Sequence, residues 1–176
     1  IYKQRRKALI GSDLKENIHS LIENELSAIA HSHIPKREEA NRDVEGFVAE
    51  LGTIFPAPAD LNSEEKLALL KRDDIVNGLT EYAHGLYKTR EAQMGADNMR
   101  ILERLLTMRS IDMHWVNHLT SIDNLRQGIG LHAYGQRDPL VMYRTDGAKM
   151  FQNLLNRIQR DVVHGIFQMS LASAPG

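Results

Sequence analysis

Two long stretches of helix-spaced apolar residues, separated by a glycine-rich break, constrain this chain more than any other feature. From Asp97 to Gln127 the apolar residues recur on one helix face. The 31 residues of this stretch would form a rod about 46 Å long at 1.5 Å per residue. A second such stretch runs from about residue 140 to 170, and the break at 128–139 holds three glycines and a proline. Because no regular helix is expected across that break, the pattern predicts an antiparallel hairpin of two long helices.

The first half of the chain predicts shorter helices. Ser12 is a plausible N-cap, Pro35 ends the helix that follows it, and Gly52 ends the next. Period-2 alternation of apolar residues never lasts beyond a few positions, so the predicted fold class is all-α. The expected helices cover residues 12–31 and 44–51, a short segment after Ser63, and residues 74–94, with a stiff extended connector at 56–58.

Composition removes several classes of function. The chain has no Cys, which excludes disulfides, thiolate zinc sites and cysteine nucleophiles. Its 22 Lys and Arg against 23 Asp and Glu give a net charge of −1, which argues against nucleic acid as a partner. No apolar run reaches the ~18–20 residues that span a bilayer, and no signal peptide is expected. Because the chain begins at Ile1, not Met, with a basic segment, we expect a piece of a larger protein.

Motifs for catalysis are missing. The sequence contains neither a phosphate-binding G-x-x-x-x-G-K-[ST] loop nor a G-x-S-x-G nucleophile elbow, so we expect no catalytic residues in this chain. One metal-site alternative stays open, because His114 and His118 are one helical turn apart. The residues between them supply no general base, and a catalytic site needs three ligands. The other reading places both histidines on the helix surface or in the seam between helices.

The break itself is the strongest candidate for functional use. Its surroundings carry Arg126, His132 and Arg137 and no carboxylate between residues 126 and 137, so the tip is locally basic. Tyr134 has the small neighbours Ala133 and Gly135, which predicts that its ring points outward. A solvated turn needs only two to five residues, and this one has about a dozen.

The segment from Ile111 to Pro139 resembles SecA, the ATP-driven motor of bacterial preprotein export. The family pattern is close to I-D-x-x-W-x-x-H-L, followed by D-x-L-R-x-G-I-x-L-R-G-Y-x-Q-K-D-P, and this chain follows it with few departures. His132 and Ala133 stand where the family usually has Arg-Gly, and Arg137 replaces Lys. The residues that carry this finger motif are Asp112, Trp115, His118, Leu119, Asp123, Leu125, Arg126, Gly128, Asp138 and Pro139.

The resemblance implies a division of the chain into parts. Residues 1–12 would end a long scaffold helix, residues 13–95 would form a helical wing domain, and residues 172–176 would be a disordered tail. Residues 96–171 would form the two-helix finger of the helical scaffold.

The resemblance also implies what the finger does. Its tip would contact the SecY channel complex and unfolded preproteins, and the hairpin would help regulate the motor ATPase. ATP and Mg would be used by motor domains of the same parent chain, with no cofactor in this fragment. The parent would be cytoplasmic and peripheral at the inner face of the bacterial plasma membrane. A helical interaction module unrelated to export is the alternative. The implied fingertip residues are Leu131, His132, Ala133, Tyr134, Gly135, Gln136 and Arg137.

Overall fold

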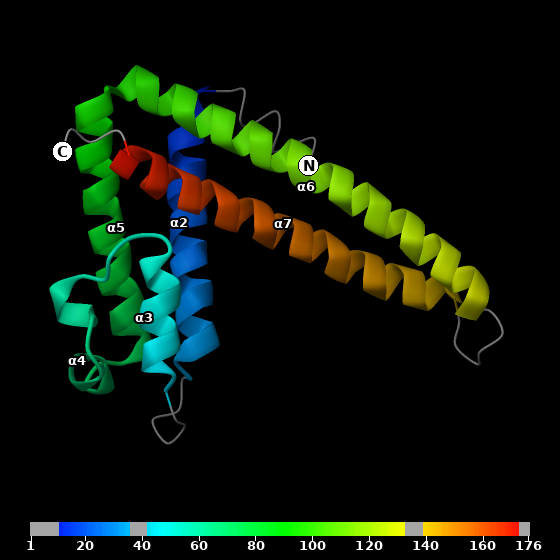
Figure 1. Ribbon diagram of the computed structural model, residues 1–176, viewed down its shortest axis with the longest axis horizontal. Helices are drawn as coiled ribbons and strands as arrows, with labels where there is room; N and C mark the ends of the chain where they lie inside the picture. Colours follow the sequence, from blue (N-terminus) through cyan, green and yellow to red (C-terminus); the bar gives the residue numbers. More distant parts are fainter. Residues whose placement is uncertain (1–10, 36–41, 133–138, 173–176) are drawn as a thin grey trace.

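The computed structural model describes residues 11–35, 42–132 and 139–172, and every regular element in those ranges is a helix. The predicted all-α fold class is therefore confirmed. Figure 1 shows α2 and α5 side by side, with α3 against α2, α4 near α3, and α6 and α7 projecting as a long hairpin. The elements are α2 (Gly11–His33), α3 (Val44–Gly52), the 3-10 helix η1 (Ala59–Leu61), α4 (Glu64–Ala68), α5 (Arg72–Met94), α6 (Ala96–His132) and α7 (Pro139–Ala172).

The ends of α2 differ slightly from the prediction. Gly11 is already helical, so Ser12 lies inside the first turn and is not the N-cap that we predicted. The helix continues to His33, two residues further than expected, and the N–H of Ile34 still donates to the carbonyl of Ala30 at 2.8 Å. Pro35 then stops it, because proline has no N–H with which to continue the ladder.

Side-chain caps begin the two short helices. The Asp43 carboxylate accepts the N–H of Gly46 at 3.1 Å at the start of α3, and the Ser63 hydroxyl accepts the N–H of Lys66 at 3.4 Å at the start of α4. Each cap satisfies an N–H that has no partner within its helix. The predicted start at Ser63 and the end of α3 at Gly52 are confirmed.

A single glycine makes the corner between α5 and α6. Gly95 has φ +90°, a conformation that L side chains rarely adopt, and its N–H donates to the carbonyl of Glu91 at 2.9 Å. Because this turn takes only one residue, α6 begins at Ala96 and Asp97 lies in its first turn. The helix therefore begins one residue before Asp97, the first residue of the stretch that the sequence predicts. The predicted division between residues 95 and 96 coincides with this corner, although the separation into domains stays a prediction.

The glycine-rich break is shorter than the sequence indicates. Residues Gly128 and Gly130 lie within α6, which has 37 residues and a length of about 55 Å, and α7 begins at Pro139. The expectation that no helix survives these glycines is wrong, since each costs a helix only about 1 kcal/mol relative to alanine. Helix α7 runs alongside α6, which supports the longer helix. At its other end α7 reaches Ala172, the first residue of the predicted tail, and 173–176 lie outside the described residues.

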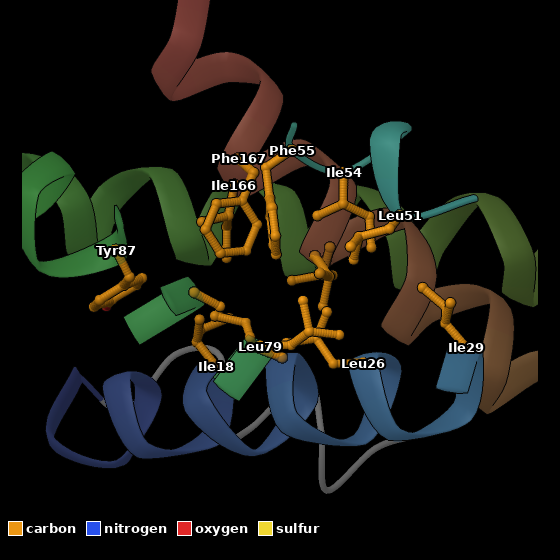
Figure 2. Close-up of a cluster of buried hydrophobic side chains, with 14 of the residues drawn as sticks. Ile18, Leu26, Ile29, Leu51, Ile54, Phe55, Leu79, Tyr87, Ile166 and Phe167 are labelled. Carbon is orange, nitrogen blue, oxygen red and sulfur yellow. The ribbon is translucent and has the colours of Figure 1, made fainter. Parts of the chain in front are cut away.

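The hydrophobic core joins the base of the hairpin to the shorter helices. Figure 2 shows Ile18 and Leu26 of α2 facing the same cluster as Leu79 of α5 and Ile166 of α7. The rings of Phe55 and Phe167 meet in this cluster at a centroid distance of 5.2 Å. The base of the hairpin, which the first part of α6 and the last part of α7 form, therefore belongs to the same core as α2 and α5.

A histidine clamp ties the end of α2 to α3. The His33 ring pairs with Asp43 through Nδ1 at 2.9 Å and with Glu50 through Nε2. The backbone N–H of Asp43 donates to the carbonyl of His33 at 3.0 Å. Hydrogen bonds first with Glu50 and then with Asp43 raise the pKa of His33, because two carboxylates favour the imidazolium form.

This clamp predicts a pH-dependent stability. A folded pKa raised above the unfolded value of about 6.5 gives stabilisation that is complete below that value and is lost as pH rises through the folded pKa. The substitution His33→Gln should therefore lower the free energy of unfolding more at pH 6 than at pH 9, as measured by urea denaturation. The matched control is His31→Gln, which removes a second histidine of the same helix whose ring contacts Ser27. Equal losses at pH 6 and pH 9 for His33→Gln would contradict the clamp.

Candidate functional site: a projecting two-helix hairpin

The half of the hairpin nearest α2 is held by close packing. Met99 and Ile111 of α6 are buried, as is the segment of α7 from Leu154 to Phe167 on its inner face. At Gly165 the two helices approach so closely that a Cβ atom would lie 2.8 Å from Cδ2 of Leu106. This half of the hairpin has little freedom to move relative to α2 and α5.

The far half of the hairpin is built differently. Among the described side chains of residues 112–128 and 140–153, none is buried. Large apolar side chains point into solvent instead, with Val116 63% exposed, Leu119 50% and Phe151 40%. Met113, Leu140 and Val141 are also exposed. Runs of exposed apolar side chains are typical of surfaces that meet another molecule. We call residues 112–128 and 140–153 the distal segment.

Aromatic rings connect the helices where the distal segment begins. The Trp115 ring stacks on His118 with centroids 5.4 Å apart and 28° between planes, and His118 meets Phe151 of α7 edge-on at 6.1 Å. The Trp115 side chain is half-buried and packs against the hydrophobic core. These contacts hold α6 and α7 together beyond the last buried residues.

The two histidines proposed as metal ligands have other partners. Nε2 of His114 pairs with the carboxylate of Asp161 on α7, while His118 stacks on Trp115. Within the part of the chain that the structure describes, no three His, Asp or Glu side chains converge as ligands for one ion. A cavity of about 190 Å³ lies beside them, lined by His114, His118, Ser121, Met150, Asn153, Leu154 and Arg157.

The described residues that flank the predicted fingertip lie at the far end of the hairpin. The ends of α6 and α7 that flank residues 133–138 lie at the opposite end of the hairpin from α2 (Figure 1). Tyr134, with Ala133, Gly135, Gln136, Arg137 and Asp138, lies outside the described residues. Leu131 and His132 are the last residues of α6, so these two belong to helix and not to loop as predicted.

The remaining motif residues are spread along both helices. Asp112, Asp123 and Arg126 are exposed, Leu125 and Gly128 are half-buried, and Pro139 is the first residue of α7. Leu119 lies on the apolar stripe that we expected to face the partner helix, yet it is half exposed, as is Leu105 nearer the wing. The apolar stripe of α6 is therefore wider than the surface that α7 covers. The structural role of the finger-motif residues stays a prediction.

A buried polar cluster near the corner at Gly95 has no counterpart in the sequence interpretation. Tyr87, Glu91, Arg100 and Glu103 hydrogen-bond with one another where α5 meets α6. The one available signal was the opposite charges of Arg100 and Glu103 three residues apart, which place both on one side of the helix. That spacing is common on solvated faces, so it does not by itself indicate burial.

An all-α unit with a two-helix arm that projects from its core is the class of protein that the fold and the hairpin define. Within the described ranges, no helix carries an apolar stretch that would suffice to cross a lipid bilayer. The chain belongs to the SecA Wing and Scaffold domain family, whose model matches residues 1–170. This family assignment agrees with the resemblance read from the finger motif.

Individual relatives are similar along nearly the whole chain. The protein translocase subunit SecA of Dehalococcoides mccartyi is 43% identical over 171 residues, which cover 97% of this chain and 18% of that protein. SecA of Pelotomaculum thermopropionicum is 38% identical over 172 residues, with 97% and 19% covered. SecA of Clostridium acetobutylicum is 35% identical over 176 residues, with 99% and 21% covered. The chain thus spans about a fifth of the length of these relatives.

The partial burial of Trp115 predicts a moderate effect on stability. The substitution Trp115→Ala should lower the free energy of unfolding by about 1–3 kcal/mol, below the ~3–5 kcal/mol that follows loss of a fully buried tryptophan. Trp115→Phe keeps a ring against His118 and should cost less than Trp115→Ala. Urea denaturation followed by circular dichroism measures both variants. An unchanged stability in Trp115→Ala would show that the ring contributes nothing to the hairpin.

Proposed function

We propose that this chain is the wing and scaffold portion of a SecA-type export motor. On this proposal its α6–α7 hairpin contacts both the translocating preprotein and the SecY channel complex. The observation that carries the proposal is the distal segment, where exposed apolar side chains lie along both helices of a hairpin that projects from the core. Membership of the SecA Wing and Scaffold domain family supports it.

The chemistry of the distal segment suits an unfolded polypeptide. Val116, Leu119 and Phe151 offer contact area without a specific hydrogen-bond pattern, so varied sequences can pack against them. A tyrosine at position 134 would extend this surface to the tip. A tyrosine ring can pack against apolar side chains while its hydroxyl bonds backbone groups.

The base of the hairpin suits the transmission of force. Helix α6 is about 55 Å long, and both helices are anchored in the core that α2 and α5 share. A displacement of that core would move the far end of the hairpin as one lever. In the parent protein, ATP and Mg would act in the motor domains, and this chain would supply no catalytic residue and hold no cofactor. The hairpin would also help to regulate the motor ATPase.

The proposed location follows from the same role. A parent that serves an export channel would be cytoplasmic and would associate peripherally with the inner face of the plasma membrane. The alternative of a helical module unrelated to export has no observation in its favour, because the chain belongs to a SecA domain family. A metal hydrolase has none either, since His114 is paired with Asp161 and His118 is stacked on Trp115.

The proposal is tested most directly at position 134. In the full-length parent, Tyr134→Gly should reduce preprotein translocation several-fold while leaving the melting temperature unchanged. Tyr134→Phe should retain most of the activity, because contact area matters more than one hydroxyl group. The measurement is the uptake of a preprotein into inverted membrane vesicles. Full export in the Tyr134→Gly parent would return the tip to the status of an ordinary connector.

A position-specific cross-linker separates contact from indirect effects. A photo-cross-linker at position 134 should capture the translocating chain or the channel, whereas one at Ala68, an exposed residue of α4, should capture neither. Equal capture at both positions would count against the hairpin as the contact site.

A further inference from the structure

Helices α2, α5 and α6 meet at the corner around Gly95, and a continuous chain of polar contacts crosses this meeting point (Figure 1). Nζ of Lys15 on α2 lies 2.9 Å from Oε1 of Glu91 on α5, and Oε2 of Glu91 lies 2.6 Å from Nη2 of Arg100 on α6. The Arg100 guanidinium also contacts Glu103 through Nε and Nη2, each at 2.9 Å. The Tyr87 hydroxyl donates to Glu103 and accepts from Arg100 at 2.6 Å. We call Lys15, Tyr87, Glu91, Arg100 and Glu103 the junction network.

The centre of the junction network is removed from solvent. Glu103 is 0% exposed and Tyr87 is 1% exposed, and Figure 2 shows Tyr87 at one end of the hydrophobic cluster. Burial raises the pKa of the Glu103 carboxyl, against the opposing effects of Tyr87 and Arg100. Burial, followed by the hydrogen bond to Glu103, also raises the pKa of Tyr87 above its usual range. Both groups are therefore held where their charged forms are disfavoured.

One histidine ring lies against the ring of Tyr87. The His19 ring of α2 lies 4.6 Å from the centroid of Tyr87 and 4.6 Å from that of His84 on α5, both edge-on. Burial, then the nearby charges of His84 and Lys15, lowers the pKa of His19. The Tyr87 ring thus meets a ring from α2, while its hydroxyl reaches α6 through Glu103.

Stability alone does not explain a buried carboxylate at this place. Taking Glu103 and part of Arg100 out of water is unfavourable, and apolar groups of the same volume often stabilise a protein as well or better. The best-attested use of buried polar groups is to fix one arrangement among several similar ones. Apolar contacts are not directional, whereas an arginine with defined acceptors fits only one geometry.

The backbone at the corner does not by itself fix one arrangement of α5 and α6. Gly95 is the only residue between α5 and α6, and a glycine has a wider range of φ and ψ than any other residue. Beyond the corner α6 diverges from α5, as Figure 1 shows. The backbone at Gly95 therefore does not set the angle between the two helices. That angle depends on side-chain contacts, and those around Gly95 act together with the packing of the hairpin base.

We propose that the junction network is an orientation lock: it fixes the direction in which the α6–α7 hairpin leaves α2 and α5, and it contributes little to global stability. Arg100 is its central positioning residue, because it alone contacts Tyr87, Glu91 and Glu103 together. The proposal concerns this chain alone and does not depend on what the hairpin contacts.

The absence of cysteine from the chain makes the orientation measurable. Cysteines introduced at the exposed positions Ser20 of α2 and Thr120 of α6 carry two spin labels, and pulsed electron spin resonance reports the distribution of distances between them. The test variant is the triple substitution Tyr87→Phe, Arg100→Met and Glu103→Leu, which removes the polar groups and keeps similar volumes. Thermal unfolding is recorded on the same samples.

The orientation lock predicts that the triple substitution changes the distance distribution but does not lower the melting temperature. The triple variant should unfold at or above the melting temperature of the same spin-labelled chain without the triple substitution. Its distance distribution should show a second peak or a width at least about twofold greater, because cores lose uniqueness before they lose stability. The matched control is Arg160→Met, which removes an exposed arginine 3.9 Å from Glu50 between α7 and α3 and should leave the distribution unchanged.

Each other outcome counts against the proposal. A folded triple variant whose distance distribution stays as narrow as that of the unsubstituted labelled chain would show that the network does not set the orientation. A triple variant that fails to fold would show that the network is needed for stability. In that case Arg100→Lys, which keeps the charge but not the planar fork, should still broaden the distribution. A narrow distribution in Arg100→Lys would overturn the orientation role as well.

Discussion

Apolar packing between α2 and the C-terminal half of α7 is the contact on which the rest of the structure depends. It joins residues that are more than a hundred positions apart, and it brings both ends of the hairpin base into the core that α2 and α5 form. Each fully buried aliphatic side chain there contributes about 1.5–3 kcal/mol relative to exposure. Without this packing α6 would be a long helix joined to the rest of the molecule chiefly through Gly95.

The same packing explains why the hairpin has two halves of different character. Where α2 lies against the helices, a third element covers their inner faces and side chains such as Ile158 and Val162 are buried. Between Leu154 and the far end of the hairpin, α6 and α7 have only each other to pack against. Two helices alone leave the apolar side chains at their edges uncovered. The exposure of Val116 and Phe151 is thus a consequence of geometry, and it provides a surface that a partner can use.

Helix periodicity carried most of the information that the sequence held about the fold. The pattern predicted α3, α5 and the pairing of α6 with α7, because apolar spacing depends only on which face of a helix is covered. It failed where local signals are weak. Gly128 and Gly130 looked like helix breakers, yet contacts along α7 outweigh a propensity penalty of about 1 kcal/mol each. The junction network was missed because it depends on which helices meet in space. The cap at Asp43 is local, and its signal was an aspartate directly before the first apolar residue of α3. The finger motif led to the family, while nothing in the described residues tests what Tyr134 does.

Hydrogen exchange of the isolated chain tests the two-part hairpin most directly. Amides at 99–111 and 154–167 should be protected as strongly as those of α2, because they open only when the shared core unfolds. Amides at 116–128 and 144–152 should exchange at least about 100-fold faster, because no third element covers them. Uniform protection along the whole of α6 and α7 would contradict the claim that the core holds only the base of the hairpin.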